Sequence, residues 1–180
     1  MRPFASALHH AAGHRGLAVW QVGYRYRGWN GDEMSPVSDA RWALDEVRRQ
    51  HGDIPVALVG HSMGGRTALR VAGDPAVRGV VALAPWLPAT DPVDQLQGRQ
   101  LLVAHGDLDR VTSPRASRLF VERARRHTSR CEFVSVRRDM HAMLLRWPAW
   151  QRLTTAYTLD AVGIAPMTER ISRLIARGFA

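Results

Sequence analysis

Short apolar runs alternate along this chain with longer segments in which apolar residues recur every three or four positions. Four of the short runs are predicted to be strands: 54–60, 78–86, 99–107 and 131–136. The runs at 54–60 and 78–86 are of the kind found in a strand buried on both faces of a sheet. A fifth strand is predicted at LAVWQVGY (17–24), where β-branched and aromatic residues follow a break that contains glycine.

Segments with helical spacing separate these runs. Helices are predicted at 3–12, 35–49, 62–73, 113–126 and 148–159. Two of them begin with Ser-Pro, which supplies a capping side chain and a first-turn proline. Strands that alternate with helices predict parallel βαβ units, and therefore an α/β fold: a three-layer α/β/α sandwich with a mainly parallel sheet. In such sheets, functional residues gather at the carboxyl ends of the strands.

The length and composition favour one domain. With 180 residues, of which 46% are hydrophobic, the chain can bury one sizeable core, and we assign residues 1–163 to it. Residues 164–180 are predicted to form an amphipathic helical tail. Its apolar face would pack against the domain, and a helix on a membrane surface or a partner is the alternative. The apolar positions of this tail are Met167, Ile171, Leu174 and Ile175, with Arg170, Arg173 and Arg177 on other faces.

Charge and cysteine content exclude several functions. The formal net charge is +9 and all 25 basic residues are arginines, but they are scattered along the chain, so no nucleic-acid partner is expected. No apolar run approaches the roughly 20 residues that a membrane span needs. The single cysteine, Cys131, cannot form an internal disulfide, which fits a reducing cytoplasm. His10 and His14 are separated by Gly13 and have no third ligand nearby, so no metal is expected.

Candidate chemistry begins at GHSMG, residues 60–64, which fits G-x-S-x-G between a predicted strand and a predicted helix. A turn this sharp should strain the backbone of Ser62, and a side chain at Gly60 or Gly64 should collide with the neighbouring strand or helix. The turn would present the Ser62 hydroxyl at the end of the sheet as a nucleophile. The alternative is that Ser62 only caps the following helix.

A serine nucleophile needs a base, and the base needs a carboxylate to orient it. Asp109 follows the strand at 99–107, and His141 follows the strand at 131–136, so both should lie at the same sheet edge as Ser62. The chain order Ser, Asp, His is the order of the triad in this type of fold. Asp107 is the competing carboxylate.

The segments GHSMGG, HGDLDRVTSP and MHAML resemble the α/β-hydrolase superfamily, in particular its small, lid-poor esterase-like and dienelactone-hydrolase-like members. The resemblance implies that Ser62 is the nucleophile, His141 the general base and then acid, and Asp109 the orienting carboxylate. Asp109 is preferred to Asp107 because the D-R-V that it begins resembles the family at this turn. The backbone N–H of Met63 would help to hold an oxyanion.

The substrate implied is a small or medium carboxylic ester or thioester, cleaved without a metal or organic cofactor. Trp86, Met140 and Trp29, together with Met63, are candidates for the wall of an open substrate pocket. Ordinary core packing explains each of them equally well.

The resemblance also implies a strand and a His-Gly loop before the first helix, where the loop would donate a second oxyanion N–H. Because Met1 falls where that helix begins, we expect an N-terminally abbreviated α/β-hydrolase fold. The strands at 17–24 and 54–60 would then either lose a shared neighbour or pair directly with each other. A catalytically impaired binding or scaffold protein is therefore the alternative function.

Overall fold

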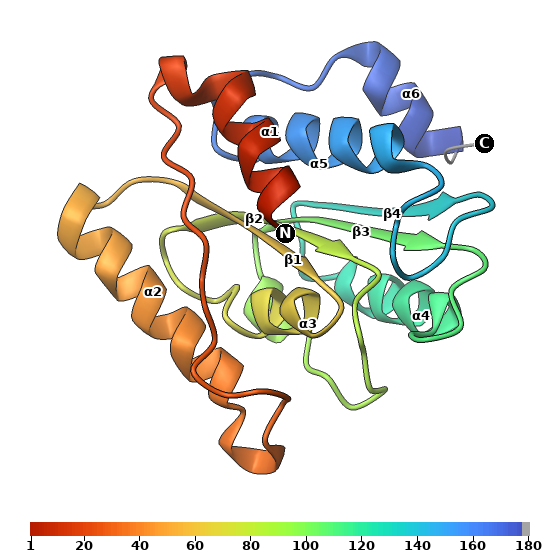
Figure 1. Cartoon of the computed structure of the whole chain (residues 1–180), viewed down its shortest axis with the longest axis horizontal. Helices are drawn as coiled ribbons and strands as arrows, with labels where there is room; N and C mark the ends of the chain where they lie inside the picture. Colours follow the sequence, from red (N-terminus) through yellow and green to blue (C-terminus); the bar gives the residue numbers. More distant parts are fainter. Residues whose placement is uncertain (178–180) are drawn as a thin grey trace.

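The computed structural model describes residues 1–177 and is built on a parallel sheet of four strands (Figure 1). The strands lie in chain order: β1 (Val56–His61), β2 (Val77–Leu83), β3 (Gln100–Gly106) and β4 (Arg130–Val136). Each pairs in parallel with the next. The four later segments predicted as strands thus form the sheet, and all four strands end at one edge.

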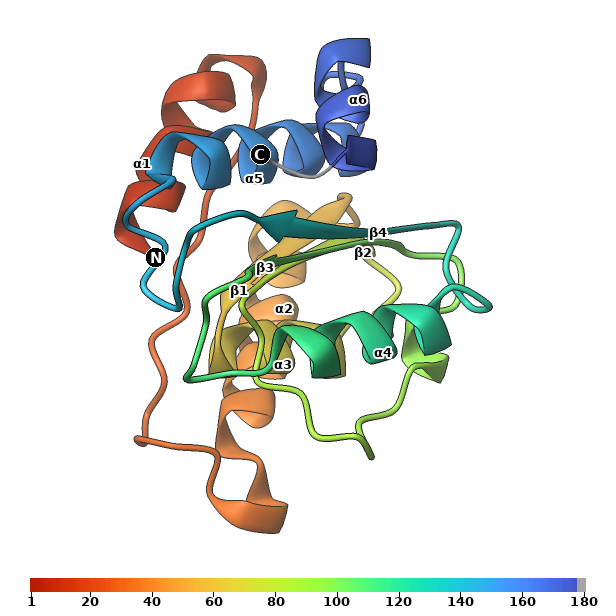
Figure 2. The same ribbon diagram turned by 90° about the vertical axis from the view of Figure 1, so that its right-hand side faces the viewer.

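Helices cover both faces of this sheet (Figure 2). One face carries α2 (Ser35–His51), α3 (Met63–Arg70) and α4 (Pro114–Ala124). The other face carries α1 (Arg2–Ala12), α5 (Trp147–Ala161) and α6 (Glu169–Arg177). The predicted three-layer α/β/α sandwich is confirmed.

Two apolar clusters, one on each face, form the core. Consecutive residues of β2 alternate between them: Val80 and Ala82 pack toward α3 and α4, whereas Val81 and Leu83 pack toward α1 and α5. All four are buried. A strand sends successive side chains to opposite faces, so a strand covered on both faces needs an apolar residue at every position.

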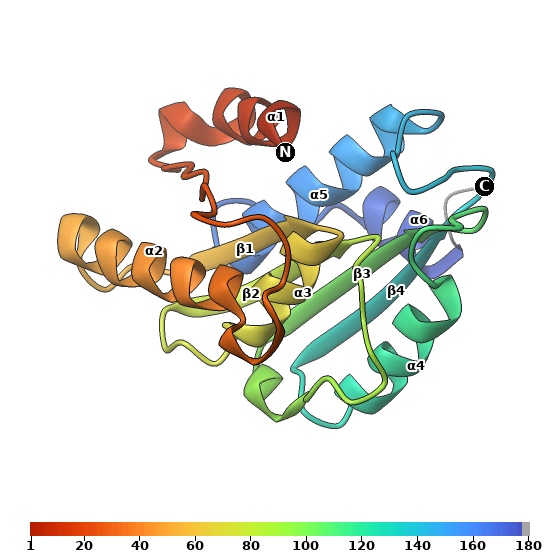
Figure 3. The ribbon, with the colours of Figure 1, turned by 60° about the horizontal axis from the view of Figure 1, so that its bottom comes forward.

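The predicted strand at residues 17–24 is wrong. This segment is an irregular connection from α1 to α2, and it pairs with no other strand in the part of the chain described (Figure 3). Trp20 and Val22 are exposed. β-propensity measures how well a side chain fits a pleated, half-buried surface, whereas a strand also needs a neighbouring backbone with which to bond. Direct pairing with the strand at 54–60 is likewise wrong, because within residues 1–177 β1 pairs with β2 alone.

The apolar side of the predicted tail packs against the core. Ile175 of α6 is buried in the cluster formed with α1 and α5, and Met167, Ile171 and Leu174 lie against that cluster. Residues 178–180 of the predicted tail lie outside the described residues. Among the helices of residues 1–177, none has the length and apolar character required to cross a bilayer.

Candidate active site

The turn from β1 to α3 contains a single residue, Ser62, between His61 and Met63. Its backbone angles are φ 54° and ψ −119°, which are strained for a residue with a side chain. The turn is possible because residue 60 is glycine: a Cβ there would lie 2.1 Å from the carbonyl oxygen of Gly64. The expected strain at Ser62 and the steric need for Gly60 are therefore both present.

The collision expected at Gly64 is wrong. A Cβ at Gly64 would approach no atom more closely than the hydroxyl of Tyr24, at 3.5 Å, which is an ordinary contact. The tight position is the next glycine, Gly65, where a Cβ would lie 3.0 Å from the Cβ of Pro85. The face of α3 that turns toward the sheet begins at Gly65, so the space is restricted one residue later than the motif indicates.

Three side chains from separate loops meet at the carboxyl edge of the sheet. The Oγ of Ser62, after β1, lies 3.0 Å from Nε2 of His141, after β4. Nδ1 of His141 lies 2.8 Å from Oδ2 of Asp109, after β3. The Ser62 side chain makes no capping hydrogen bond to α3. Asp107 lies apart from this group, because it is exposed and its Oδ1 accepts a hydrogen bond of 2.7 Å from the backbone N–H of Arg138.

The Asp109 carboxylate is buried and densely hydrogen-bonded. Oδ1 accepts bonds from the backbone N–H groups of Val111 (2.8 Å) and Thr112 (3.0 Å), and Oδ2 lies 2.9 Å from the Thr112 hydroxyl. Burial alone would raise the pKa of Asp109, but the bonds from Thr112, His141 and Val111 outweigh it and hold this pKa at about 2. The carboxylate is therefore ionised at neutral pH and can orient the imidazole of His141.

A second histidine, which the sequence reasoning missed, also contacts this carboxylate. His105 is fully buried at the end of β3, with Nε2 3.1 Å from Oδ2 of Asp109 and Nδ1 2.8 Å from the hydroxyl of Ser117. Burial lowers the pKa of His105, which favours the neutral ring. Because the ionised Asp109 carboxylate can only accept, Nε2 of the neutral ring carries the proton and donates to Asp109, and Nδ1 accepts from the Ser117 hydroxyl. The available signal was a histidine inside the apolar run LLVAHG.

The loop that carries His141 is held from two sides. Nε2 of His61 lies 2.9 Å from the backbone carbonyl of His141, and the two rings are 4.6 Å apart. The buried carboxylate of Asp139 accepts bonds from the backbone N–H groups of Met140 (2.8 Å) and Arg146 (2.9 Å) and from Nε1 of Trp150 (2.7 Å). Neither anchor was predicted, since each joins residues that have no recognisable spacing in the sequence.

The other predicted site residues lie around this group. Met63 is the first residue of α3, so its N–H has no acceptor within its own helix. Trp86 is held next to the turn, because its backbone N–H donates a hydrogen bond of 3.2 Å to the backbone carbonyl of Ser62. The rings of Trp86 and Trp29 meet edge to face, 5.9 Å apart. Met140 is exposed beside His141.

The guanidinium of Arg66 covers part of the ring surface of Trp29 and Trp86 that a ligand would otherwise contact. It lies 3.8 Å from the ring centre of Trp29 and 4.5 Å from that of Trp86. Its Nε and one Nη donate to the buried carboxylate of Asp91 at 2.7 and 3.0 Å. Each indole therefore has part of its surface occupied by a fixed cation, and the 41% of Trp86 that is exposed is what remains for a ligand.

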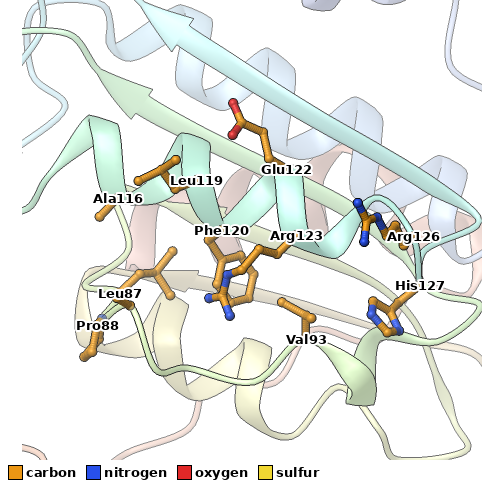
Figure 4. Close-up of a pocket in the computed structure, with 11 residues that line it drawn as sticks. Leu87, Pro88, Val93, Ala116, Leu119, Phe120, Glu122, Arg123, Arg126 and His127 are labelled. Atoms are coloured by element: carbon orange, nitrogen blue, oxygen red, sulfur yellow. The ribbon is translucent and has the colours of Figure 1, made fainter.

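A cavity of about 640 Å³ lies between α4 and the segment that follows β2 (Figure 4). Leu87, Val93 and Phe120 form its apolar part, and Arg123 and Arg126 its cationic part. Ser62, Asp109 and His141 do not line it. No group of three His, Cys, Asp or Glu side chains within residues 1–177 is arranged to hold a metal ion.

The family model described as "Alpha/beta hydrolase family" matches residues 2–178. This chain belongs to the α/β-hydrolase family. A comparison with curated protein sequences finds no significant match.

Solved structures of similar fold support the architecture of this α/β-hydrolase. An α-β serine hydrolase homologue from Coxiella burnetii has a TM-score of 0.64 at 20% identity, covering 84% of this chain and 74% of the other. The esterase domain of a Rhodothermus marinus protein has a TM-score of 0.65 at 20% identity, covering 89% and 79%. A putative hydrolase from Xanthomonas campestris has a TM-score of 0.64 at 20% identity, covering 87% and 88%. At these identities the likeness concerns the fold alone.

Proposed function

We propose that this α/β-hydrolase is a serine hydrolase that cleaves a small or medium carboxylic ester or thioester through an acyl-enzyme. The observation that carries the proposal is the continuous hydrogen-bonded chain from Ser62 Oγ through both ring nitrogens of His141 to Asp109. A hydroxyl, a base and an orienting anion in this geometry are what nucleophilic acyl transfer requires.

In the first half-reaction, Ser62 Oγ attacks the carbonyl carbon while Nε2 of His141 takes the hydroxyl proton. The negative charge that develops on the carbonyl oxygen is stabilised by the N–H of Met63 at the start of α3. The tetrahedral adduct then collapses, and His141 passes its proton to the departing alcohol or thiol. Asp109, ionised and buried, keeps the Nδ1 proton of His141 in place throughout.

In the second half-reaction, a water molecule takes the place of the alcohol or thiol. His141 removes its proton as the water oxygen attacks the acyl carbon, and then returns a proton to Ser62 Oγ as the carboxylic acid leaves. The sum is one ester or thioester and one water converted to one carboxylic acid and one alcohol or thiol, so the proposed reaction needs no redox partner.

The test is labelling by a fluorophosphonate probe, followed by identification of the modified peptide. We expect the wild-type protein to be modified at Ser62 and Ser62→Ala to be unmodified. Ser172→Ala removes an exposed serine of α6 and should leave labelling unchanged, which makes it the matched control. A folded wild-type protein that is not labelled would reject the proposal and favour the alternative, a binding or scaffold protein.

A further inference from the structure

Large apolar side chains are exposed together at the edge of the sheet where Ser62 lies. Leu108, Val111, Met140, Leu144 and Leu145 are each between 49% and 73% exposed. All five belong to two loops, the one after β3 and the one after β4, which project from the same edge of the molecule (Figure 1). Single exposed apolar residues are common on protein surfaces, whereas a cluster indicates an interaction surface.

This cluster lies in the two loops that carry Asp109 and His141 of the candidate active site. Leu108 immediately precedes Asp109, and Met140 immediately precedes His141. The two loops are joined to each other, because the N–H of Leu108 donates to the carbonyl of Asp139 at 3.1 Å. The exposed apolar groups therefore lie in the same two joined loops as the two partners of Ser62, Asp109 and His141. We call residues 107–112 and 137–146 the catalytic-edge surface.

The leucines are held outward by the structure of their loop. The carboxylate of Asp139 accepts the backbone N–H groups of Leu145 (3.3 Å) and Arg146 (2.9 Å), which fixes the path of the chain beside Leu144. Met143, within the same turn, is buried in the core against α5. The loop thus buries Met143 and keeps the two residues that follow it, Leu144 and Leu145, exposed.

Positive charge accompanies the apolar groups. Arg110, Arg137 and Arg138 are exposed in the same two loops, and none of them forms an ion pair within residues 1–177. The exposed acidic residue there is Asp107, which bonds to the backbone of Arg138. A surface with protruding leucines and flanking arginines complements an anionic lipid–water interface, where hydrocarbon accepts the leucines and phosphates attract the guanidinium groups.

We propose that the catalytic-edge surface docks onto an anionic phospholipid interface and that the substrate of this site is an ester presented in that interface. The second part rests on the proposed serine hydrolase function. Docking in this orientation would bring the opening at Ser62 against the lipid, so that an ester could reach the nucleophile without crossing bulk water.

Docking is tested by co-sedimentation with vesicles of phosphatidylcholine alone and of phosphatidylcholine mixed with phosphatidylglycerol. We expect the wild type to bind the mixed vesicles, and Leu144→Ser combined with Leu145→Ser to bind more than about tenfold more weakly. Arg137→Gln combined with Arg138→Gln should lose roughly fivefold per charge. Leu119→Ser, a half-exposed leucine of α4 outside the surface, is the matched control and should bind normally.

Vesicle binding by Ser62→Ala should equal that of the wild type, which separates docking from catalysis. Docking is overturned if the wild type does not bind mixed vesicles or if the double leucine variant binds them as well as the wild type. Self-association of the wild type without vesicle binding, abolished in the leucine variant, would assign the surface to a second copy of the chain and also overturn the proposal.

The substrate part is tested with p-nitrophenyl butyrate in solution and the medium-chain ester p-nitrophenyl decanoate embedded in the mixed vesicles. We expect the double leucine variant to keep the rate on the soluble ester and to lose most of the rate on the embedded ester. An equal effect on both esters would overturn the substrate assignment. Vesicle binding by a wild type that hydrolyses neither ester would reject the serine hydrolase function while leaving docking intact.

Discussion

The replacement Asp109→Asn tests whether Asp109 or Asp107 is the carboxylate that orients His141. Oδ2 of Asp109 lies 2.8 Å from Nδ1 of His141, whereas Asp107 is exposed and bonds to the backbone N–H of Arg138. An asparagine at position 109 can place an N–H toward Nδ1, which favours the wrong tautomer of His141. We therefore expect kcat for ester hydrolysis to fall by roughly a thousandfold or more.

The same replacement has a calculable effect on stability. The folded-state pKa of Asp109 is about 2, compared with an ordinary value of 3.8. This difference corresponds to at most about 2.5 kcal/mol, and with partial solvent screening we expect about 1 to 2 kcal/mol. Because the folded-state pKa is the lower one, the contribution is present above pH 4 and is lost as the pH falls from about 4 toward 2.

The assays are the initial rate of ester hydrolysis at neutral pH and urea unfolding at several pH values between 3 and 7. The free-energy difference between wild type and Asp109→Asn should shrink toward the acidic end of this range. Asp107→Asn is the matched control and should change kcat less than about twofold and stability less than about 0.5 kcal/mol. The reasoning is refuted if Asp107→Asn impairs hydrolysis as strongly as Asp109→Asn, or if the stability difference does not depend on pH.

Three further replacements test other parts of the site. Gly60→Ala should lower the free energy of unfolding in urea by about 3 kcal/mol, because the new Cβ would lie 2.1 Å from the backbone oxygen of Gly64. Gly64→Ala is the control and should change this free energy little. Equal effects of the two replacements would contradict the steric argument. His105→Leu removes a hydrogen-bond donor to the charged Asp109, so it should lower the free energy of unfolding by about 1.5 to 3 kcal/mol and also lower kcat. His105→Gln should recover part of both, because its amide can donate to Asp109. No recovery would argue against that hydrogen bond. Asp139→Ala leaves the N–H groups that Asp139 accepts without an acceptor, so it should lower the free energy of unfolding in urea by about 3 kcal/mol. A variant as stable as the wild type would show that Asp139 is not an anchor of this loop.

The secondary structure around the site could largely be predicted because its signals are local. An apolar run of five to eight residues is what a strand between two helical layers requires, and the central strands at 77–83 and 100–106 are buried along most of their length. The edge strand at 130–136 is less apolar and only partly buried, but its β-branched and aromatic residues still indicate a strand. The segment 17–24 has a similar composition but forms no strand, because strand formation also depends on a neighbouring backbone, which composition does not encode.

The contacts around Asp109 and His141 show where prediction from sequence stops. His105 and Asp109 are only four residues apart, yet their hydrogen bond depends on how β3 turns into the following loop. His61 and His141 are 80 residues apart and are joined by the parallel order of the sheet. A motif names residue types, but hydrogen bonds depend on distances of a few tenths of an ångström, which only the packed chain provides.

By itself, the sequence determined that this chain is an α/β protein with a G-x-S-x-G turn and with acidic and histidine candidates after later strands. Those properties depend on residue type and local periodicity. The tertiary structure decided which carboxylate faces His141, that His105 contacts it as well, and that the two loops carrying Asp109 and His141 also expose leucines and arginines. These properties depend on which loops come together at one sheet edge, and that is settled by the packing of two helical layers against the sheet.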